Sequence, residues 1–461
     1  MTSPRTAAEA CFLDGSACLQ AGDFARAESA FREALGHDGE FAEAHGNLAW
    51  LLERRFQPIE AESHYRSALA QDLGQTRILV NLGAFLAAQK RFDEAEAAYR
   101  QAILQDPQFV AAWSNLGVLY ACRKQEVQAE RCYRTALCLD ENHAGARFNL
   151  SYILLRQGRF EEGWACLEVR DWYGGLGARL PCPRWQGESL VGKSLIIGVE
   201  AGHGDMIQFS RYAAVLKARG AAAITLICHT PLKRLFRTLA AVDLVVGLDQ
   251  ALPAGHYDFW VPPLSLPLQC GTREHNIPAP IPYLQAVPGE VARWSAVLPR
   301  GGLRVGLVWK GSVAFENDAD RSLPGIAALA PLWSVAGVRF VSLQKGAGEL
   351  EAATPPPGQP LMDVGPALGD FADTAAVVAS LDLVISVDTA VAHLASALGK
   401  PCWVLLPWYR TDWRWLDGRS DSPWYPGVLR LFRQPAFGDW ASVIAEVASA
   451  LARLSPGACR T

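Results

Sequence analysis

Four polar segments in the second half of the sequence combine side chains that bind anions or transfer protons. Each segment follows a short apolar run, and in folds of alternating strand and helix the ligands bind at the carboxyl ends of the strands. The four segments are Gly202-His203-Gly204-Asp205, Lys310-Gly311-Ser312 with Arg321 close behind, Gln344-Lys345-Gly346, and Asp388-Thr389-Ala390.

The segment at Asp388 has the pattern of a phosphate site. Thr389 is an expected N-cap, and the helix expected over 390–398 would turn the N–H group of Ala390 toward an anion. His393 lies four residues after Thr389 on the same helix face, so we expect it to point at the same anion. The alternative for His393 is a buried core histidine.

Two further loops offer positive charge to such an anion. Arg321 has the permanent charge and the planar geometry that suit a diphosphate, and Lys310 and Ser312 precede it on the same loop. Gln344 and Lys345 follow the next expected strand. The alternative is an exposed cation for Lys310 and for Arg321, and a plain turn for Gln344-Lys345.

Asp205 is the candidate for proton transfer. Its Gly-x-Gly-Asp spacing is not the Gly-x-Gly-x-x-Gly fingerprint of dinucleotide binding. A carboxylate at the end of a strand can take a proton from an acceptor hydroxyl, and we expect Gly204 and Gln208 on the acceptor side. The alternative is that Asp205 only caps the following helix.

Alternating strands and helices must position these segments. They predict two tandem parallel sheets of Rossmann type that face one cleft, separated by a Pro-rich loop over 262–288. The expected strands are 194–199, 223–228, 244–246, 304–309, 339–343, 383–387 and 402–406, and the expected helices are 208–219, 326–334, 372–380, 390–398 and 439–454.

The first half of the sequence is a repeat with a period of 34 residues. Small residues at fixed positions let antiparallel helices approach closely, and we expect the aromatic residues to fill the groove to the next repeat. The repeated columns are Asn47, Asn81, Asn115 and Asn149; Phe31, Tyr65, Tyr99 and Tyr133; and Gly15, Ala49, Gly83, Gly117 and Ser151. This pattern resembles the tetratricopeptide repeat, with repeats near 8–41, 42–75, 76–109 and 110–143 and a partial fifth from 144 to about 170.

Such an array forms a concave surface that holds a peptide or protein segment, and its asparagines are candidates to clamp the bound backbone. The alternatives are a solenoid that only dimerises or supports the second half, and asparagines that serve as structural hydrogen bonders.

Composition narrows the class of protein. The 461 residues include 43 Lys and Arg against 47 Asp and Glu, a net charge of −4 that argues against bulk nucleic-acid binding. No apolar run is long enough to span a bilayer, and Met1–Ala10 lacks the apolar core of a signal peptide, so we expect a cytoplasmic protein. The 11 cysteines have irregular spacing without Cys-x-x-Cys, so we expect reduced core residues and no metal site.

The polar segments, taken in order, resemble bacterial glycosyltransferases that follow a tetratricopeptide array. Those enzymes have GT-B architecture and are similar to the lipopolysaccharide heptosyltransferases and, more remotely, to protein O-GlcNAc transferase. The resemblance is carried by Glu200 to Phe209, Val305 to Trp309, Arg321-Ser322, Ser342 to Gly346, Asp370 to Ala375, Asp388 to Ala395, Asp412-Trp413-Arg414-Trp415, Ser422 to Pro426 and Leu431 to Gln434.

The resemblance implies an inverting, metal-independent transfer of sugar from a nucleotide-sugar donor. Asp205 matches the expected general base, and Arg321 matches the residue that neutralises the leaving diphosphate. The motif that holds the phosphates and sugar of the donor is matched by Asp388, Thr389, Ala390 and His393, and the further donor-binding candidates are Lys310, Ser312, Gln344 and Lys345. The sequence departs from the pattern at His203, at Ser312-Val313 and at Phe315, where Leu, Asn-Pro and His are usual, and these departures bear on sugar choice and activity.

The tethered repeats favour a protein hydroxyl as acceptor, because they raise the local concentration of the protein that they hold. Flagellin O-glycosyltransferases of bacteria have this layout. Two alternatives stay open: a lipid-linked or polysaccharide acceptor with the repeats recruiting the enzyme to an assembly complex, and a non-catalytic repeat scaffold whose cleft has decayed. We expect no cofactor besides the substrate nucleotide sugar, no nucleic-acid partner and no membrane span.

The expected domains follow from these patterns. They are a repeat array over 1–170, a linker over 171–190, an N-terminal Rossmann-like acceptor domain over 191–290, a C-terminal Rossmann-like donor domain over 300–435, and a C-terminal helix over 436–461.

Overall fold

The computed structural model describes residues 4–71, 75–278 and 280–454. Contacts divide the chain into two compact units, Met1–Leu150 and Ser151–Thr461. Cys459 and the end of the expected C-terminal helix lie outside the described residues. In the part of the chain that the structure describes, every helix is too short or too polar to cross a membrane.

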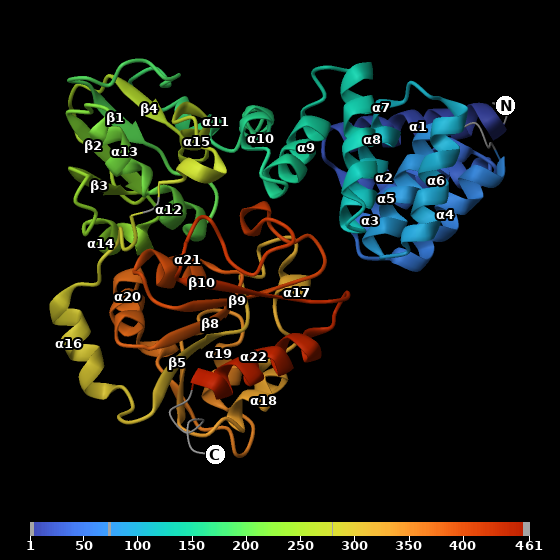
Figure 1. The fold of residues 1–461 in the computed structure, drawn as a ribbon. Coiled ribbons are helices and arrows are strands. Elements are labelled where there is room, and N and C mark those ends of the chain that lie inside the picture. Colours follow the sequence, from blue (N-terminus) through green and yellow to red (C-terminus); the bar gives the residue numbers. More distant parts are fainter. Residues whose placement is uncertain (1–3, 72–74, 279, 455–461) are drawn as a thin grey trace. The chain divides into compact units, whose positions relative to one another are not determined.

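The first unit is a solenoid of antiparallel helix pairs, drawn in blue and cyan in Figure 1. The expected repeat architecture is therefore confirmed. Its helices are α1 (Pro4–Gln20), α2 (Phe24–His37), α3 (Ala42–Arg54), α4 (Pro58–Gln71), α5 (Thr76–Ala88), α6 (Phe92–Gln105), α7 (Val110–Cys122) and α8 (Glu126–Leu139), and α9 (Ala144–Arg156) begins the partial fifth repeat.

The glycine and aromatic columns of the repeat meet inside each helix pair. A Cβ atom on Gly83 would lie 2.5 Å from Cε1 of Tyr99, and one on Gly117 would lie 2.6 Å from Cε1 of Tyr133. These rings thus pack on the glycine of their own repeat, rather than only filling the groove to the next one. Tyr65 does reach the next repeat, with its ring centroid 5.9 Å from that of Phe85.

The second helix of each full repeat also carries a glutamate and an arginine one turn apart. These pairs have N···O distances of 2.7–3.0 Å and are Glu28 with Arg32, Glu62 with Arg66, Glu96 with Arg100, and Glu130 with Arg134. Each such exposed pair stabilises the fold by at most about 1 kcal/mol. The charge on this helix face is therefore neutralised within the array itself.

The second unit begins with a four-stranded parallel sheet in the order β3-β2-β1-β4. Because β2 and β3 lie on one side of β1 and β4 lies on the other, the loop after β1 opens at the point where the strand order reverses, which is where ligands of such sheets bind. The strands are β1 (Ser194–Ile197), β2 (Ala223–Cys228), β3 (Leu244–Gly247) and β4 (Phe259–Val261), and the helices around them are α11 (Gly174–Gly177), α12 (His203–Phe209), α13 (Tyr212–Ala218), α14 (Lys233–Phe236) and α15 (Leu266–Gln269).

The second sheet is also parallel, with the order β10-β9-β8-β5-β6-β7. Its order reverses between β5 and β8, so the loops after these two strands share one crevice. The strands are β5 (Leu303–Val308), β6 (Val338–Ser342), β7 (Leu361–Asp363), β8 (Leu383–Val387), β9 (Cys402–Leu406) and β10 (Leu429–Arg433), and the helices are α16 (Pro288–Val297), α17 (Asp318–Arg321), α18 (Ala330–Trp333), α19 (Glu349–Ala353), α20 (Phe371–Ala379), α21 (Ala390–Ala397) and α22 (Trp440–Leu454).

Apolar side chains from strands and helix α22 form the core of this sheet. Leu307, Ile385 and Leu405 from three neighbouring strands are buried together with Ile444 and Val447 of α22. Burial of each such side chain contributes about 1.5–3 kcal/mol. Figure 1 shows α22, in red, beside α18. The two expected sheets are thus confirmed, and they hold their loops on a rigid base.

Some expected element bounds were wrong. The helix expected over 208–219 is two helices, α12 and α13, and α12 already begins at His203 because a side chain in its first turn caps the N–H group of Gly202. The helix is interrupted between α12 and α13, where Arg211 Nε donates to the carbonyl of Gln208 at 2.9 Å. Strands β4 and β7 were not expected, since three residues are too few to show a period.

The segment that follows the last full repeat is built into the second unit. Arg156 Nη1 donates to the carbonyl of Thr411 at 2.9 Å, and Trp164 Nε1 of α10 (Phe160–Leu167) donates to the carbonyl of Thr272 at 3.0 Å. Further along, the backbone N–H of Trp185 donates to the carbonyl of Trp260 in β4 at 2.7 Å. The residues from 151 to 185 therefore complete the α/β unit, while the expected domain bounds stay predictions.

Candidate functional site

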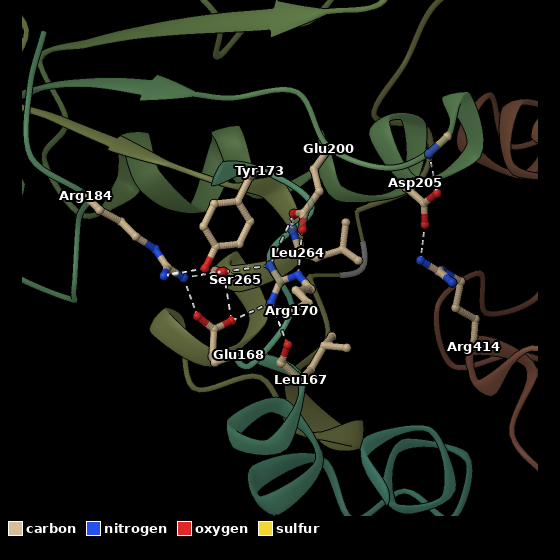
Figure 2. A network of polar contacts seen from close by, with 11 residues as sticks. Leu167, Glu168, Arg170, Tyr173, Arg184, Glu200, Asp205, Leu264, Ser265 and Arg414 are labelled. Atoms are coloured by element: carbon tan, nitrogen blue, oxygen red, sulfur yellow. Dashed lines mark hydrogen bonds and ion pairs between the residues drawn. The ribbon is translucent and has the colours of Figure 1, made fainter. Parts of the chain in front are cut away.

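The loop after β1 is fixed at its start by a buried network of charged side chains. Arg170 Nε donates to Glu200 Oε1 at 2.6 Å, and both side chains are fully buried. Arg170 also donates to Glu168 Oε1 and Ser265 Oγ, each at 2.8 Å, and Arg184 joins the same group through Ser265. Figure 2 shows Arg170 between the two glutamates. Two arginines and two glutamates thus balance their charges beneath the loop.

Asp205 stands at the other end of this loop, in the first turn of α12. Its Oδ2 accepts the N–H of Gly202 at 2.9 Å, and its Oδ1 accepts a hydrogen bond from Arg414 Nη2 (Figure 2). The side chain of Asp205 keeps 21% of its surface exposed. Asp205 therefore both caps its helix, as the alternative expectation had it, and offers a carboxylate that solvent can reach.

Asp388 follows the end of β8, within electrostatic reach of Arg414 and Asp412. Its Oδ2 accepts the indole N–H of Trp415 at 2.8 Å. Burial and the negative charge of Asp412 raise the pKa of Asp388 to about 6, although the Trp415 hydrogen bond and the charges of Arg321 and Arg414 oppose the increase. A carboxyl group with such a pKa changes its charge near neutral pH, which is typical of functional sites.

The helix after Asp388 starts as expected, but its cap is different. Thr389 occupies the N-cap position, yet its hydroxyl is hydrogen-bonded to Ser386 Oγ at 2.9 Å and makes no capping bond. Thr389 is therefore the N-cap residue, as expected, but its hydroxyl is engaged by Ser386 and does not cap the helix. The backbone N–H groups of Ala390 and Val391 have no acceptor among the described residues, and such groups at a helix start favour an anion.

His393 is buried, as the alternative expectation had it. It lies against Gly204 of α12, where the two lobes of the unit, one built on each parallel sheet, meet. Its Nδ1 is hydrogen-bonded to the hydroxyl of Tyr425 at 2.9 Å, and its ring stacks on Trp415 at a centroid distance of 5.2 Å. Burial, followed by the charges of Arg414 and Arg211, holds the pKa of His393 well below its usual value. His393 is therefore a neutral imidazole at physiological pH and cannot supply positive charge.

The loop after β5 carries the permanent cation. Arg321 Nε donates to Asp318 Oδ1 at 3.1 Å, and its guanidinium lies 4.2 Å from the ring centroid of Phe315. Its charge is also felt at Asp388, whose pKa it lowers. Phe315, where a histidine is usual, thus supports the face of Arg321 by a cation–π contact. Ser312 is exposed on the same loop.

Gln344 organises the two lysine loops. Its Oε1 accepts the backbone N–H groups of Trp309 and Lys310, both at 3.0 Å, and its Nε2 donates to the carbonyls of Lys310 and Lys345. The ammonium groups of these lysines donate to the carbonyls of Pro324 and Gly365 at 2.9 and 3.0 Å. Gln344 is therefore held by the backbone, and it positions both loops rather than pointing its amide outward.

The asparagine column of the repeats is half-buried on the first helices. The side chains of Asn47, Asn81, Asn115 and Asn149 make no hydrogen bond with any other described residue. A row of amides without protein partners at a step of one repeat is suited to the regularly spaced polar groups of an extended backbone.

The sequence predicts reduced cysteines in the core and no metal site. No disulfide links the ten described cysteines, and Cys138 is exposed rather than in the core. Among the residues that the structure describes, one set of possible metal ligands gathers within 4.8 Å, namely Cys11, Glu33 and His37 on α1 and α2. That set belongs to the repeat array, and the expectation of no metal stays a prediction.

The sequence patterns assign no role to Arg414, although its segment, Asp412 to Trp415, carries part of the resemblance. The structure places this segment against both Asp205 and Asp388. Arg211 was not expected from the sequence either. Its buried guanidinium donates to the carbonyl of Trp424 at 2.6 Å and to the hydroxyl of Tyr283 at 3.2 Å. The sequence offered one signal for these roles: both arginines lie in or contact segments that are rich in tryptophan and tyrosine. Those segments carry no motif that assigns a chemical role.

Comparison with known proteins places both halves of the chain. Residues 53–117, and residues 15–76 with 127–163, match descriptions of the tetratricopeptide repeat. Residues 328–405 match the glycosyltransferase family 9 (heptosyltransferase) description. The chain therefore carries tetratricopeptide repeats in its first half and, over residues 328–405, a segment similar to glycosyltransferase family 9. The match covers β8 and α21, and with them Asp388 and His393.

One curated relative aligns across both halves. The chain is 30% identical over 335 residues to Protein FlbA of Caulobacter vibrioides, a match that covers 66% of this chain and 54% of FlbA. The chain therefore spans about half the length of the relative that it matches.

Solved structures resemble the repeats. The chain is 24% identical to pilF of Pseudomonas aeruginosa, with a TM-score of 0.37, over 47% of this chain and 88% of that protein. It is 20% identical to a tetratricopeptide repeat protein of Parabacteroides merdae, with a TM-score of 0.31, over 38% and 68% of the two chains. Scores this low support no argument about function.

Proposed function

We propose that this protein is an inverting glycosyltransferase that transfers a sugar from a nucleotide-sugar donor to a hydroxyl of a protein held by the repeats. The observation that carries the proposal is the close contact of Gly204, the neighbour of Asp205 at the switch point of the first sheet, with Ala390 and His393 of the motif at the switch point of the second. A carboxylate and an anion site on facing loops are the two parts that such a transfer needs.

The donor binds at the second sheet in this proposal. The free N–H groups at the start of α21 and the guanidinium of Arg321 meet the diphosphate, and Asp388 binds the sugar. Lys310 and Lys345 add positive charge at the neighbouring loops that Gln344 holds. Fixed cations and N–H groups stabilise the charge of a leaving diphosphate without a metal ion, which is why we propose a metal-independent reaction.

Asp205 acts as the general base on the opposite side. It takes the proton of the acceptor hydroxyl while the hydroxyl oxygen bonds to the anomeric carbon and the nucleoside diphosphate leaves with the electron pair. Attack from the side opposite the leaving group inverts the anomeric centre. The carboxylate is in place for this step because its helix cap and its contact with Arg414 fix it.

The acceptor is a protein in this proposal, and a Ser or Thr of flagellin is the specific candidate. The row of unpartnered asparagines on the first helices supports it, because each amide can both donate to and accept from the peptide groups of an extended polypeptide. A tethered array then raises the local concentration of the acceptor at the transferase unit.

A thermal-shift screen with UDP, GDP, ADP and CMP sugars tests the proposal, because a ligand that binds only the native state raises the melting temperature. We expect one nucleotide to raise it in the wild type, and to raise it less in Arg321→Ala. Arg430→Ala is the matched control, since Arg430 is paired with Glu446 on the surface.

The donor so found is then incubated with flagellin, and the wild type should form product that Asp205→Ala does not. A well-folded protein that binds none of the nucleotides would instead point to a repeat scaffold, and transfer to a lipid-linked acceptor alone would reject the protein acceptor.

A further inference from the structure

Arg414 contacts both lobes of the α/β unit through every nitrogen of its guanidinium. Its Nε donates to Gln208 Oε1 at 2.7 Å, and its Nη2 donates to Asp205 Oδ1, both on α12. Its Nη1 donates to the two carboxylate oxygens of Asp412 at 3.0 and 2.9 Å. The planar fork of an arginine matches these three acceptor side chains, whereas the point charge of a lysine does not.

The surroundings of Arg414 keep it in one position. Its side chain is only 8% exposed, and its guanidinium lies 4.5 Å from the ring centroid of Trp413. Burial opposes the charge, but the carboxylates of Asp205 and Asp412 more than compensate and raise the pKa of Arg414. A permanent positive charge is therefore fixed against the carboxylate of Asp205.

The contacts of Asp205 leave it able to accept a proton. Each carboxylate oxygen has two lone pairs, and the hydrogen bonds from Gly202 and Arg414 use one on each oxygen. One lone pair on each oxygen stays open to the acceptor. The two hydrogen bonds, one from its own helix start and one from the opposite lobe, orient those lone pairs.

Arg414 also orients a second polar group. Because Gln208 Oε1 accepts from Arg414, Gln208 Nε2 must face the other way, and this buried nitrogen has no hydrogen-bond partner among the described residues. A buried amide donor without a partner costs free energy unless a ligand or water binds it. It lies one helical turn after Asp205.

We propose that Arg414 is the positioning residue of the transfer reaction. It holds the carboxylate of Asp205 in one orientation across the two lobes. The proton moves to a carboxylate oxygen of Asp205, the acceptor oxygen bonds to the anomeric carbon, and the bond from that carbon to the diphosphate oxygen breaks. This role rests on the proposed function, since without transfer there is no proton for Asp205 to accept.

Several other groups act on Asp205 and bear on its pH dependence. The negative charge of Asp205 contributes to the raised pKa values of Glu200 and Tyr152, so both groups lie within its electrostatic reach. Asp412 acts on it indirectly, by sharing Arg414. His393, which borders Gly204, is neutral. Arg414 is thus the cation in direct contact with the carboxylate, and its removal should favour protonation of Asp205.

The test is the pH dependence of kcat for Arg414→Gln, with Arg414→Lys and Arg419→Gln beside it. We expect Arg414→Gln to lower kcat at least tenfold and to move the acid limb of the profile to higher pH by about one unit, with the thermal shift from the donor nucleotide retained. Arg414→Lys should keep the wild-type position of the limb at a reduced kcat, because it restores the charge but not the fork. Arg419, paired with Asp421 on the same segment, is the matched control, and its variant should keep the wild-type profile.

The outcomes separate this role from a purely structural one. An Arg414→Gln enzyme that binds nucleotide and is slower at every pH by the same factor would overturn the positioning role. If Arg414→Gln does not fold, Arg414→Lys decides: a wild-type kcat in that variant rejects the role, and a lower kcat with an unmoved limb supports it. A wild-type protein that transfers no sugar rejects the proposed function itself, and this role with it.

Discussion

Gly204 of α12 lies directly against His393 of α21. A Cβ atom on Gly204 would stand 2.9 Å from Cδ2 of His393 and 3.5 Å from Cα of Ala390. The imidazole cannot retreat, because it stacks on Trp415 and is hydrogen-bonded to Tyr425. The segment of the proposed base thus rests on α21, the proposed donor-binding helix, with no room for a side chain.

We predict that Gly204→Ala separates these two helices. Overpacking of this kind costs about 1–3 kcal/mol, so the melting temperature should fall and the nucleotide-induced shift should shrink. Gly175→Ala is the control, because a Cβ at Gly175 meets no atom within 4 Å. Calorimetry of both variants measures the effect, and an equal melting temperature for the two would contradict the close contact.

Much of this fold could be predicted from the sequence because its signals are local or periodic. The repeat period and the buried strands β5, β8 and β9 recur within a few residues of their expected bounds, since each reflects an apolar pattern along one stretch of chain. The expected helix over 208–219 was wrong at its start because the cap at Asp205 and the break at Arg211 depend on single hydrogen bonds.

The buried network at Arg170 supports a second prediction. Replacing Arg170 with methionine leaves Glu200 buried without its cation, which typically costs about 3–5 kcal/mol. The exposed pair of Arg430 with Glu446 is the control, and Arg430→Met should cost less than about 1 kcal/mol. The measurement is urea unfolding followed by tryptophan fluorescence.

Transfer should also suffer in Arg170→Met, since Glu200 anchors the start of the loop that ends at Asp205. A variant that unfolds at the same urea concentration as the wild type would show that water enters the network and replaces the arginine.

The asparagine column gives a third prediction. The double variant Asn81→Ala with Asn115→Ala should weaken capture of the acceptor protein at least tenfold, because both amides lack partners within the described chain. Its melting temperature should stay within a few degrees of the wild type, since the substitutions remove no hydrogen bond between described residues and alanine favours the helix. Isothermal titration with the acceptor measures the affinity.

Asn142→Ala is the control for the double variant, because Asn142 is exposed in the turn before α9 rather than on a first helix. If the double variant bound the acceptor as tightly as this control, the asparagine column would have no part in binding.

The candidate site was only partly predictable for a physical reason. Asp388 and Asp205 could be identified because each follows an apolar strand, β8 or β1, and the loops at the carboxyl ends of parallel strands are where ligands bind. The partner of Asp205 is Arg414, which lies 209 residues later in the sequence. No local pattern encodes a contact of that separation, because it depends on how the two lobes pack.

The pKa of Asp388 supports the last prediction. Its folded-state pKa of about 6 lies above its ordinary value of 3.8, so the folded protein binds this proton more tightly than the unfolded chain does. The ionised carboxylate therefore destabilises the native state above about pH 6, and this cost disappears below about pH 4, where both states are protonated. Asparagine cannot ionise and can still accept the N–H of Trp415. We thus expect Asp388→Asn to raise the free energy of unfolding by about 1–3 kcal/mol at pH 8 and to leave it unchanged near pH 4.

Asp14→Asn, at an exposed position on α1, should show no such gain. A gain of the same size at both pH values would mean that Asp388 is not the titrating group, and an Asp388→Asn enzyme that still transferred sugar at the wild-type rate would remove Asp388 from the donor site.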